Sequence, residues 1–415
     1  MQTTFNLLAG SGVLFITLLT SHLSHAHGGA VRASYVLTEK QKLERLQIPV
    51  LYHDPETGLA VTYGTDQITT RLSADSHLGG SCAGYQALEE GADPLAILRE
   101  TQQVFRLHDR LARLPMLPRP IETDPEIEAA ISQVSEAHLR SSVEWLMSYG
   151  TRFNKGSTPN RHVDDLKTKL QQMTAGSKLK TAINVISHRS TKQNSLHLRV
   201  EGSERPNEIV VLGAHLDSIS GGGWGGGGGS APGADDNASG SSNLIEALRI
   251  LLTQNKAPAR TLDFFWYAGE ESGLLGSGEI AQDYKAKGAD VVGVLQLDMT
   301  LFPGEGELVI GNVTDYTNAW LRDYFTRIND AYLHARIVED RCGYACSDHA
   351  SWHRQGYAAF VPFESTTKTM NPDIHTSRDV ISNRSSFTHM AAFSKIALIF
   401  AMDFGNSTQR PPNAL

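Results

Sequence analysis

Cysteine is scarce in this chain, because only Cys82, Cys342 and Cys346 occur among its 415 residues. So few cysteines exclude a small scaffold built from disulfide bonds. Excess positive charge is absent too, since 37 basic residues face 45 acidic ones and the formal net charge is -8. Without a basic field to attract a phosphate backbone, we expect no nucleic-acid partner. The chain has 40% hydrophobic residues, which is enough for a packed core.

Long hydrophobic runs are missing except near the start, where an apolar stretch covers residues 7–20. This stretch is short for a membrane helix, and Ser24, His25 and Ala26 follow it in the small-residue form of a signal cleavage site. No Lys or Arg precedes it, although signal peptides usually begin with positive charge. We predict a signal peptide over residues 1–26, secretion and no membrane anchor. A buried or disordered apolar start is the alternative.

A proline-rich run at residues 115–120 divides the chain, because prolines in series cannot continue a helix. A helical pattern precedes the run at residues 94–114, and a new helix can begin after it. Thr123 or Asp124 can cap that helix, with Pro125 in its first turn. We predict that residues 27–122 form a removable propeptide and that residues 123–415 form the main domain. A permanent N-terminal domain is the alternative.

Beyond the proline-rich run, short β-branched segments alternate with longer amphipathic ones. We predict buried strands at residues 209–215, 261–268 and 291–298, with helices at residues 241–253 and 275–287 between them. This alternation indicates an α/β fold with a mixed, mostly parallel central sheet and helices on both faces. Polar residues cluster where the strands end, and the carboxyl ends of parallel strands are where sites form in such sheets.

Two of the predicted strands lead to residues that can bind a metal. The first ends in His215, and Asp217 lies on the same face of the extended segment, so it can orient the imidazole. The third ends in Asp298, a carboxylate that would be costly to bury without a cation. A hydrogen-bonded structural role is the alternative for His215 taken alone.

Adjacent acids occur at two places. Asp235 and Asp236 stand among glycines before a helix, where capping would account for one carboxylate. The glycines allow the backbone to bring Asp235 towards His215. Glu270 and Glu271 follow the second strand, where neighbouring side chains point in different directions. One of them can therefore hold a metal while the other faces its water.

A second histidine, His375, stands in a loop far downstream. Two histidines and three carboxylates form a donor set suited to zinc, in which a shared aspartate bridges two ions. The candidate ligands are therefore His215, Asp235, Asp298, His375 and one of the two glutamates.

Cys342 and Cys346 can form a disulfide bond if the protein is exported. An extended chain would hold their Cα atoms too far apart, so the bond requires a tight turn, which Gly343 permits. Two reduced core cysteines are the alternative, and Cys82 has no assigned role.

The chain resembles the zinc aminopeptidases of peptidase family M28, typified by secreted bacterial leucyl aminopeptidases, from about Asp124 to near Phe404. This resemblance implies a zinc-exopeptidase fold in which residues 123–415 form the catalytic domain, and the family is commonly made with a propeptide. The segments that carry it are Gly213–Ser218, Pro232–Gly240, Glu270–Glu271, Leu295–Thr300, Cys342–Trp352 and Pro362–Ser365.

The resemblance also assigns roles to individual residues. It makes Glu270 the general base and implies that Tyr344 helps to stabilise the oxyanion. Asp217 and Asp236 would stand behind the ligands, and a cis peptide bond would join Asp235 to Asp236. Two zinc ions per chain are implied, the first held by His215 and Asp298, the second by Glu271 and His375, and both by Asp235.

The implied substrate is a peptide with a free N-terminus, whose first side chain enters an apolar pocket. Thr367 and Met370 stand where close relatives carry aromatic residues, which favours a more open or adaptable pocket. We expect a preference for leucine-like residues, and we expect a monomer. The residues implied around the pocket are Met299, Val313, Cys342, Cys346, Phe363 and Ile374.

The prediction is a secreted metallo-aminopeptidase. Related zinc hydrolases, namely a carboxypeptidase, a deacylase or a single-zinc glutaminyl cyclase, are alternatives on the same fold, and the full ligand set weighs against the cyclase. A non-catalytic binding relative is a further alternative, although it would be expected to lack ligands or base.

Overall fold

The computed structural model describes residues 34–78, 84–88, 91–112, 121–221 and 229–408. The predicted signal peptide, the proline-rich run and Cys82 lie outside the described residues. Residues 33–415 form one compact unit by their contacts.

The N-terminal part of this unit, residues 34–112, contains a small antiparallel sheet. Its strands have the order β2-β3-β1-β4, and every described pair in it is antiparallel. The helix expected at residues 94–114 is confirmed as α3, which is described as far as Ala112. The elements of this part are β1 (Tyr35–Glu39), α1 (Lys40–Arg45), β2 (Tyr52–His53), β3 (Leu59–Tyr63), α2 (Asp66–Leu78), β4 (Gln86–Ala87) and α3 (Pro94–Ala112).

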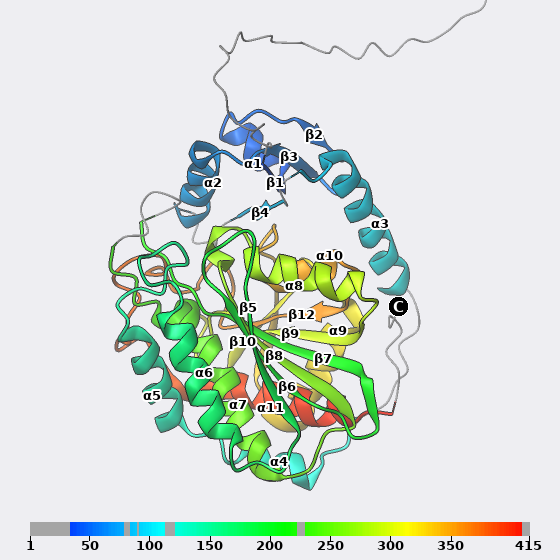
Figure 1. The fold of residues 1–415 in the computed structure, drawn as a ribbon, viewed down its shortest axis with the longest axis vertical. Helices are drawn as coiled ribbons and strands as arrows, with labels where there is room; N and C mark the ends of the chain where they lie inside the picture. Colours follow the sequence, from blue (N-terminus) through cyan, green and yellow to red (C-terminus); the bar gives the residue numbers. More distant parts are fainter. Residues whose placement is uncertain (1–33, 79–83, 89–90, 113–120, 222–228, 409–415) are drawn as a thin grey trace, which may run out of the picture. The chain divides into compact units, whose positions relative to one another are not determined.

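The main part, residues 121–408, is built on a six-stranded sheet with the order β12-β9-β7-β8-β6-β5 (Figure 1). Strands β12, β9, β7 and β8 run parallel, whereas β6 is antiparallel to both of its neighbours. The mixed, mostly parallel sheet is therefore confirmed. Its strands are β5 (Thr181–Ile186), β6 (Ser195–Val200), β7 (Arg205–His215), β8 (Arg260–Tyr267), β9 (Asp290–Gln296) and β12 (Ala359–Phe360). A smaller sheet comprises β10 (Val309–Val313), β11 (Arg336–Asp340) and β13 (Pro362–Phe363).

Helices cover both faces of the central sheet. Val210 and Leu212 of β7 pack into the largest hydrophobic cluster, together with α5, α7 and α11. Val211 points to the other face and packs in a second cluster with Ile280 of α8 and Trp352 of α10. This alternation follows from the two-residue period of a strand. The helices are α4 (Pro125–Ile131), α5 (Glu136–Met147), α6 (Arg161–Thr174), α7 (Gly240–Gln254), α8 (Leu275–Ala286), α9 (Ala319–Ile328), α10 (His349–Arg354) and α11 (Phe387–Ile399), with short turns η1 (Ala234–Ser239), η2 (Glu270–Ser272), η3 (Asn329–Leu333) and η4 (Phe400–Phe404).

The main part begins with the helix expected after the proline-rich run. Asp124 caps α4, because its side chain accepts a hydrogen bond of 2.8 Å from the amide of Glu126. Pro125 occupies the first helical position, where a missing N–H costs nothing.

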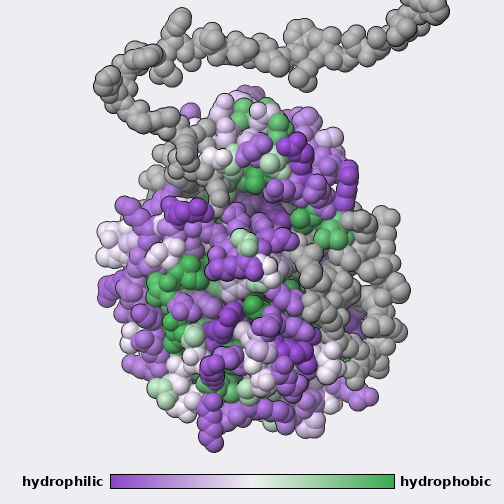
Figure 2. Space-filling view, turned by 45° about the vertical axis from the view of Figure 1, so that its right-hand side comes forward, coloured by the Kyte–Doolittle hydropathy of each residue, from purple (hydrophilic) through white to green (hydrophobic). Residues whose placement is uncertain are grey.

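One stretch among the described residues, Phe387–Phe404, is long and apolar enough to cross a membrane, with a mean hydropathy of 1.3. Within the protein it is 78% buried, and Ser394 on it accepts a hydrogen bond of 2.8 Å from Asn243 of α7. These contacts are those of a core helix. On the face drawn in Figure 2, hydrophilic residues dominate and apolar ones gather in small patches.

Candidate metal centre and substrate pocket

The carboxyl ends of three parallel strands bring the predicted site residues together. His215 at the end of β7 lies beside Tyr267 at the end of β8, and β9 runs parallel to β7 on its other side. Glu270 follows β8 after Gly269, whose φ of 63° is in the left-handed region that glycine adopts easily. Asp298 follows β9. Residues distant in sequence thus meet at one edge of the sheet, as expected for an α/β fold.

Two groups of buried side chains offer metal-ligand atoms, and the ligand atoms in each group lie within 4.8 Å of one another. In the first group, Nε2 of His215 lies 3.1 Å from Oδ1 of Asp236 and 3.3 Å from Oδ1 of Asp298. In the second, Nε2 of His375 lies 2.8 Å from Oδ2 of Asp236 and 3.0 Å from Oε2 of Glu271. The two oxygens of Asp236 therefore face different histidines, which is the arrangement of a carboxylate shared by two cations.

The expectation that Asp235 is the shared carboxylate is wrong. Oδ1 of Asp235 accepts a hydrogen bond of 2.9 Å from the amide of Leu301, and Oδ2 accepts one of 3.1 Å from Asn371. Asp235 belongs to neither ligand group, and Asp236, expected behind the ligands, belongs to both. The cis peptide bond also lies one residue later than expected, between Asp236 and Asn237.

The local backbone explains why Asp236, and not Asp235, faces the two histidines. Asp236 has φ -107° and ψ 95°, so the chain is not helical there and the two side chains leave it in different directions. Asp379 holds this conformation, because its carboxylate accepts hydrogen bonds from the amides of both Asp235 and Asp236, at 3.1 and 3.0 Å. Sequence reasoning missed Asp379 and Asn371, and no local motif marks either one.

The residues present fit a pair of metal ions. Nε2 of His215, Oδ1 of Asp298 and both carboxylate oxygens of Glu271 have no hydrogen-bond partner in the described part of the chain. These three residues are at most 3% exposed, so water does not satisfy those atoms. Buried polar atoms without partners are costly, and a cation would satisfy all of them at once. Imidazole and carboxylate ligands suit zinc.

The crowding of acids around the histidines shifts their ionisation. Burial alone would lower the pKa of His375, but Glu271 and Asp236 outweigh that effect and raise it to about 10. Burial and the nearby Asp236 raise the pKa of Glu271 to about 7. Burial would also raise the pKa of Asp236, yet the facing imidazoles of His215 and His375 hold that pKa well below its usual value. Such shifts concentrate at functional sites.

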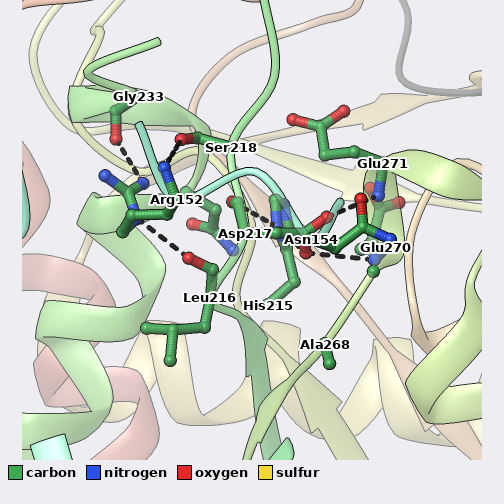
Figure 3. A network of polar contacts seen from close by, with 12 residues as sticks. Arg152, Asn154, His215, Leu216, Asp217, Ser218, Gly233, Ala268, Glu270 and Glu271 are labelled. Carbon is green, nitrogen blue, oxygen red and sulfur yellow. Dashed lines mark hydrogen bonds and ion pairs between the residues drawn. The ribbon is translucent and has the colours of Figure 1, made fainter. Parts of the chain in front are cut away.

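Asp217 lies behind His215 as predicted and also supports the adjacent glutamates (Figure 3). Its Oδ1 is 3.5 Å from Nδ1 of His215 and accepts a hydrogen bond of 3.0 Å from the amide of Glu270. Its Oδ2 accepts a bond of 3.3 Å from the amide of Glu271. The sequence did not indicate this second contact, which ties the loop after β8 to the end of β7.

Glu270 is 1% exposed, and neither of its carboxylate oxygens has a hydrogen-bond partner among the described residues. Burial raises the pKa of its carboxyl group well above the usual value, and the neighbouring Glu271 adds to the shift. A carboxylate with both oxygens unengaged at the edge of a metal centre is able to take up a proton.

An apolar cavity adjoins the site and is lined by both Asp298 and Tyr344. Five of the six residues expected around the pocket line it, whereas Ile374 packs in the same hydrophobic cluster without lining the cavity. Thr367 and Met370 line it as well. The five are Met299, Val313, Cys342, Cys346 and Phe363.

Cys342 and Cys346 form the expected disulfide bond, with their Cα atoms 6.4 Å apart. Gly343 makes the turn possible with a φ of 85°, which other residues rarely adopt. The bridge forms one wall of the apolar cavity, and the turn it closes carries Tyr344.

Known proteins match this chain in sequence. The model of peptidase family M28 matches residues 195–401. A probable leucine aminopeptidase of Arthroderma otae is 36% identical to it over 66% of this chain and 74% of its own length. Leucine aminopeptidase 1 of Coccidioides posadasii is 33% identical over 76% of this chain and 82% of its own length.

Solved structures share the fold. The LapA aminopeptidase of Legionella pneumophila has a TM-score of 0.75 at 25% identity, covering 91% of this chain and 99% of its own. LapB from the same organism has a TM-score of 0.73 at 23% identity, covering 90% of this chain and 100% of its own. Matches of this length extend beyond residues 121–408 into the N-terminal part.

Proposed function

This chain belongs to peptidase family M28, and from that membership we propose that it is a secreted aminopeptidase that uses two zinc ions to remove leucine-like residues from the N-termini of peptides. The family and the leucine aminopeptidase relatives support a metallo-aminopeptidase. The observation that carries the finer proposal is the pair of ligand groups that share Asp236, beside the unengaged carboxylate of Glu270.

Each of the two ligand groups would hold one metal ion. When bound, zinc supplies Lewis acidity, which polarises a carbonyl group and lowers the pKa of water. His215, Asp236 and Asp298 would hold one ion, and Asp236, Glu271 and His375 would hold the other.

The other residues act on the substrate and its protons. The carboxylate of Glu270 accepts a proton from the attacking water and passes it to the leaving amine. The hydroxyl of Tyr344, beside the pocket, donates a hydrogen bond to the oxyanion that develops on the scissile carbonyl. The first side chain of the substrate enters the apolar cavity, whose lining by Met299, Val313 and Phe363 suits a leucine-like residue.

Zinc content and substrate choice test this proposal together. The purified protein should hold two zinc ions per chain and hydrolyse a leucyl anilide faster than an arginyl anilide. It should leave an N-acetyl-leucyl anilide intact, because the free amine is part of what is recognised. Fewer than two ions per chain in fully active protein would contradict the two-zinc mechanism.

The blocked substrate also separates the alternatives. Cleavage of N-acetyl-leucyl substrates would point to a carboxypeptidase or a deacylase, and cyclisation of N-terminal glutamine would point to a glutaminyl cyclase. A non-catalytic binding relative would show no turnover of any of these substrates.

The disulfide beside the pocket offers a test of substrate preference. The bridge closes a short loop and so adds little global stability. We expect Cys346→Ser to change the ratio of leucyl to arginyl hydrolysis more than it changes the melting temperature. Unchanged preference with a large loss of stability would contradict this role.

The proposal includes a signal peptide over residues 1–26 and a propeptide over residues 27–122. Support comes from contacts beside the catalytic loop: the amide of Ala87 donates a hydrogen bond of 3.1 Å to the carbonyl of Gly273, which follows the adjacent glutamates. The ammonium of Lys42 lies 5.6 Å from the centre of the Tyr344 ring. A segment in this position would hinder access until it is removed.

Sequencing the mature secreted protein tests the maturation. Its N-terminus should lie near Thr123, and the mature protein should elute as a monomer. A mature N-terminus near His27 with full activity would instead support a permanent N-terminal domain.

A further inference from the structure

Arg152 is a fully buried arginine that binds backbone carbonyls around the metal centre. It is 1% exposed and follows Thr151, which forms a parallel β-bridge with Ala231. Its Nε donates a hydrogen bond of 2.9 Å to the carbonyl of Leu216, and its Nη2 donates one of 2.9 Å to the carbonyl of Gly233 (Figure 3). Its Nη1 donates one of 2.6 Å to Pro232.

These acceptors belong to two of the three segments that carry the first ligand group. Leu216 lies between His215 and Asp217, and Gly233 lies three residues before Asp236. One planar guanidinium group with fixed donor directions therefore joins the end of β7 to the turn before α7. The backbone adds a second link, since the amide of Arg152 donates to Oγ of Ser218 at 3.1 Å, and Ser218 donates to Ala231 at 2.8 Å.

The packing around this contact leaves little freedom. Gly233 has φ 54°, and a Cβ atom there would lie 2.8 Å from Nη2 of Arg152 and 2.6 Å from Cβ of Ser218. No residue with a side chain fits without displacing the guanidinium group or the turn. The close approach of the two segments thus depends on both the arginine and the glycine.

The charge of Arg152 is unusual because, among the described residues, no carboxylate pairs with it directly. Burial lowers the pKa of Arg152 to about 10, and Asp379, Asp217 and Asp236 oppose that shift, so the group stays charged at neutral pH. Arg260, which is 0% exposed, instead forms an ion pair with Glu208, with 2.6 Å between Nε of Arg260 and Oε2 of Glu208. A buried charge bound only to carbonyls indicates a task beyond ion pairing.

We propose that Arg152 is a positioning residue that fixes the spacing between His215 and Asp236 and so sets the affinity of the first ligand group for zinc. This inference rests on the proposed function. Two effects oppose each other, because a positive charge near the site repels zinc while the carbonyl contacts hold the ligands in place. Without the guanidinium, several converging carbonyls lose their donors, and the segments relax apart. Positioning therefore outweighs repulsion.

The test compares Arg152→Met with Arg260→Met, since the two arginines are equally buried and Arg260 begins β8 at the end away from the site. Zinc affinity is measured for each by competition with a chelator, and melting temperatures are taken with and without zinc. Arg152→Met should weaken zinc binding by about 10- to 100-fold, the range typical for groups that orient ligands, with turnover at saturating zinc within a few-fold of wild type. Arg260→Met should lower the melting temperature and leave zinc affinity unchanged.

Arg152→Lys carries the test if Arg152→Met does not fold, because it keeps the charge and loses the planar fork. It should weaken zinc binding by several-fold. Unchanged or tighter zinc binding in the Arg152 variants would overturn the inference, even though the wild type holds two zinc ions. A wild type that binds no zinc would instead refute the proposed function itself.

Discussion

Strand β8 contains one buried acid, Asp263, and two further buried acids, Glu270 and Glu271, lie just beyond its end. The surroundings of Asp263 differ from those of the two glutamates. Asp263, within the strand, is 0% exposed and accepts hydrogen bonds of 2.7 and 2.6 Å from Arg199, 2.8 Å from His197 and 2.7 Å from Tyr284. Burial would raise the pKa of Asp263, but Arg199 and His197 outweigh it and lower that pKa to about 2.

Glu270 and Glu271 are just as buried, at 1% each, yet their carboxylate oxygens have no hydrogen-bond partner among the described residues. Burial raises the pKa of both. The difference teaches that burial of an acid does not identify its role. A carboxylate surrounded by donors stabilises the fold, whereas one left without donors is available to a cation, a proton or a substrate.

The largest effects should come from substitutions of the adjacent glutamates Glu270 and Glu271. Both side chains are carboxylates, but we expect the two substitutions to have different consequences for zinc content and turnover. Glu270→Gln removes the proton acceptor and leaves the ligands in place. Zinc should stay near two per chain while turnover falls by about 10²- to 10⁴-fold. Glu271→Gln removes a ligand, so the protein should lose up to one zinc and regain some activity in excess zinc.

Metal analysis and steady-state kinetics on both variants decide between the roles. If Glu270→Gln lost metal while Glu271→Gln kept two ions, the roles would be reversed. If both changes were nearly silent, neither acid would belong to the site.

The next largest effect should distinguish Asp236 from Asp235, the residue predicted from the sequence as the shared ligand. Asp236→Asn replaces a carboxylate that faces both His215 and His375, so it should cost zinc at both positions and most of the activity. Asp235→Asn changes an acid that accepts hydrogen bonds outside both ligand groups, so zinc should remain near two per chain. Zinc per chain after dialysis measures this, and the opposite pattern would restore Asp235 as the shared ligand.

Asp263→Asn should lower the free energy of unfolding and leave turnover unchanged. Removing one partner of a buried ion pair is expected to cost about 3 kcal/mol in the free energy of unfolding, with Arg199 able to reach solvent. Asp283→Asn is the control, because that acid pairs with Lys287 at the surface and should cost at most about 1 kcal/mol. Urea denaturation and turnover per folded molecule are the measurements. A large loss of turnover in stable Asp263→Asn protein would contradict a purely structural role.

The smallest predicted effect is the pH dependence of that same contribution. Because the pKa of Asp263 is depressed in the folded state, its stabilisation is present above the ordinary pKa of about 4 and is lost as the pH falls through about 2. The gap in unfolding free energy between wild type and Asp263→Asn should shrink by about 1 kcal/mol from pH 7 to pH 3. A gap that widened in acid would show that the sign is wrong.

Much of the fold could be predicted because its elements depend on local patterns. The strands expected at residues 209–215 and 261–268 correspond to β7 and β8 within a few residues, and the helix expected at residues 241–253 corresponds to α7. Long apolar runs and amphipathic periods are local properties, and a sheet edge where strands end follows from them.

The sequence by itself determined which residue types gather at the carboxyl edge of the sheet, since strand ends and adjacent acids are visible in the chain. It did not determine which of Asp235 and Asp236 turns inwards, and the prediction of Asp235 was wrong, because neighbouring residues differ only in the dihedral angles of one short turn. Only the tertiary structure decided this, through the hydrogen bonds that Asp379 accepts from both amides. It alone also brought Arg152 against two distant carbonyls, because contacts across long stretches of sequence depend on the packed fold and on no local pattern.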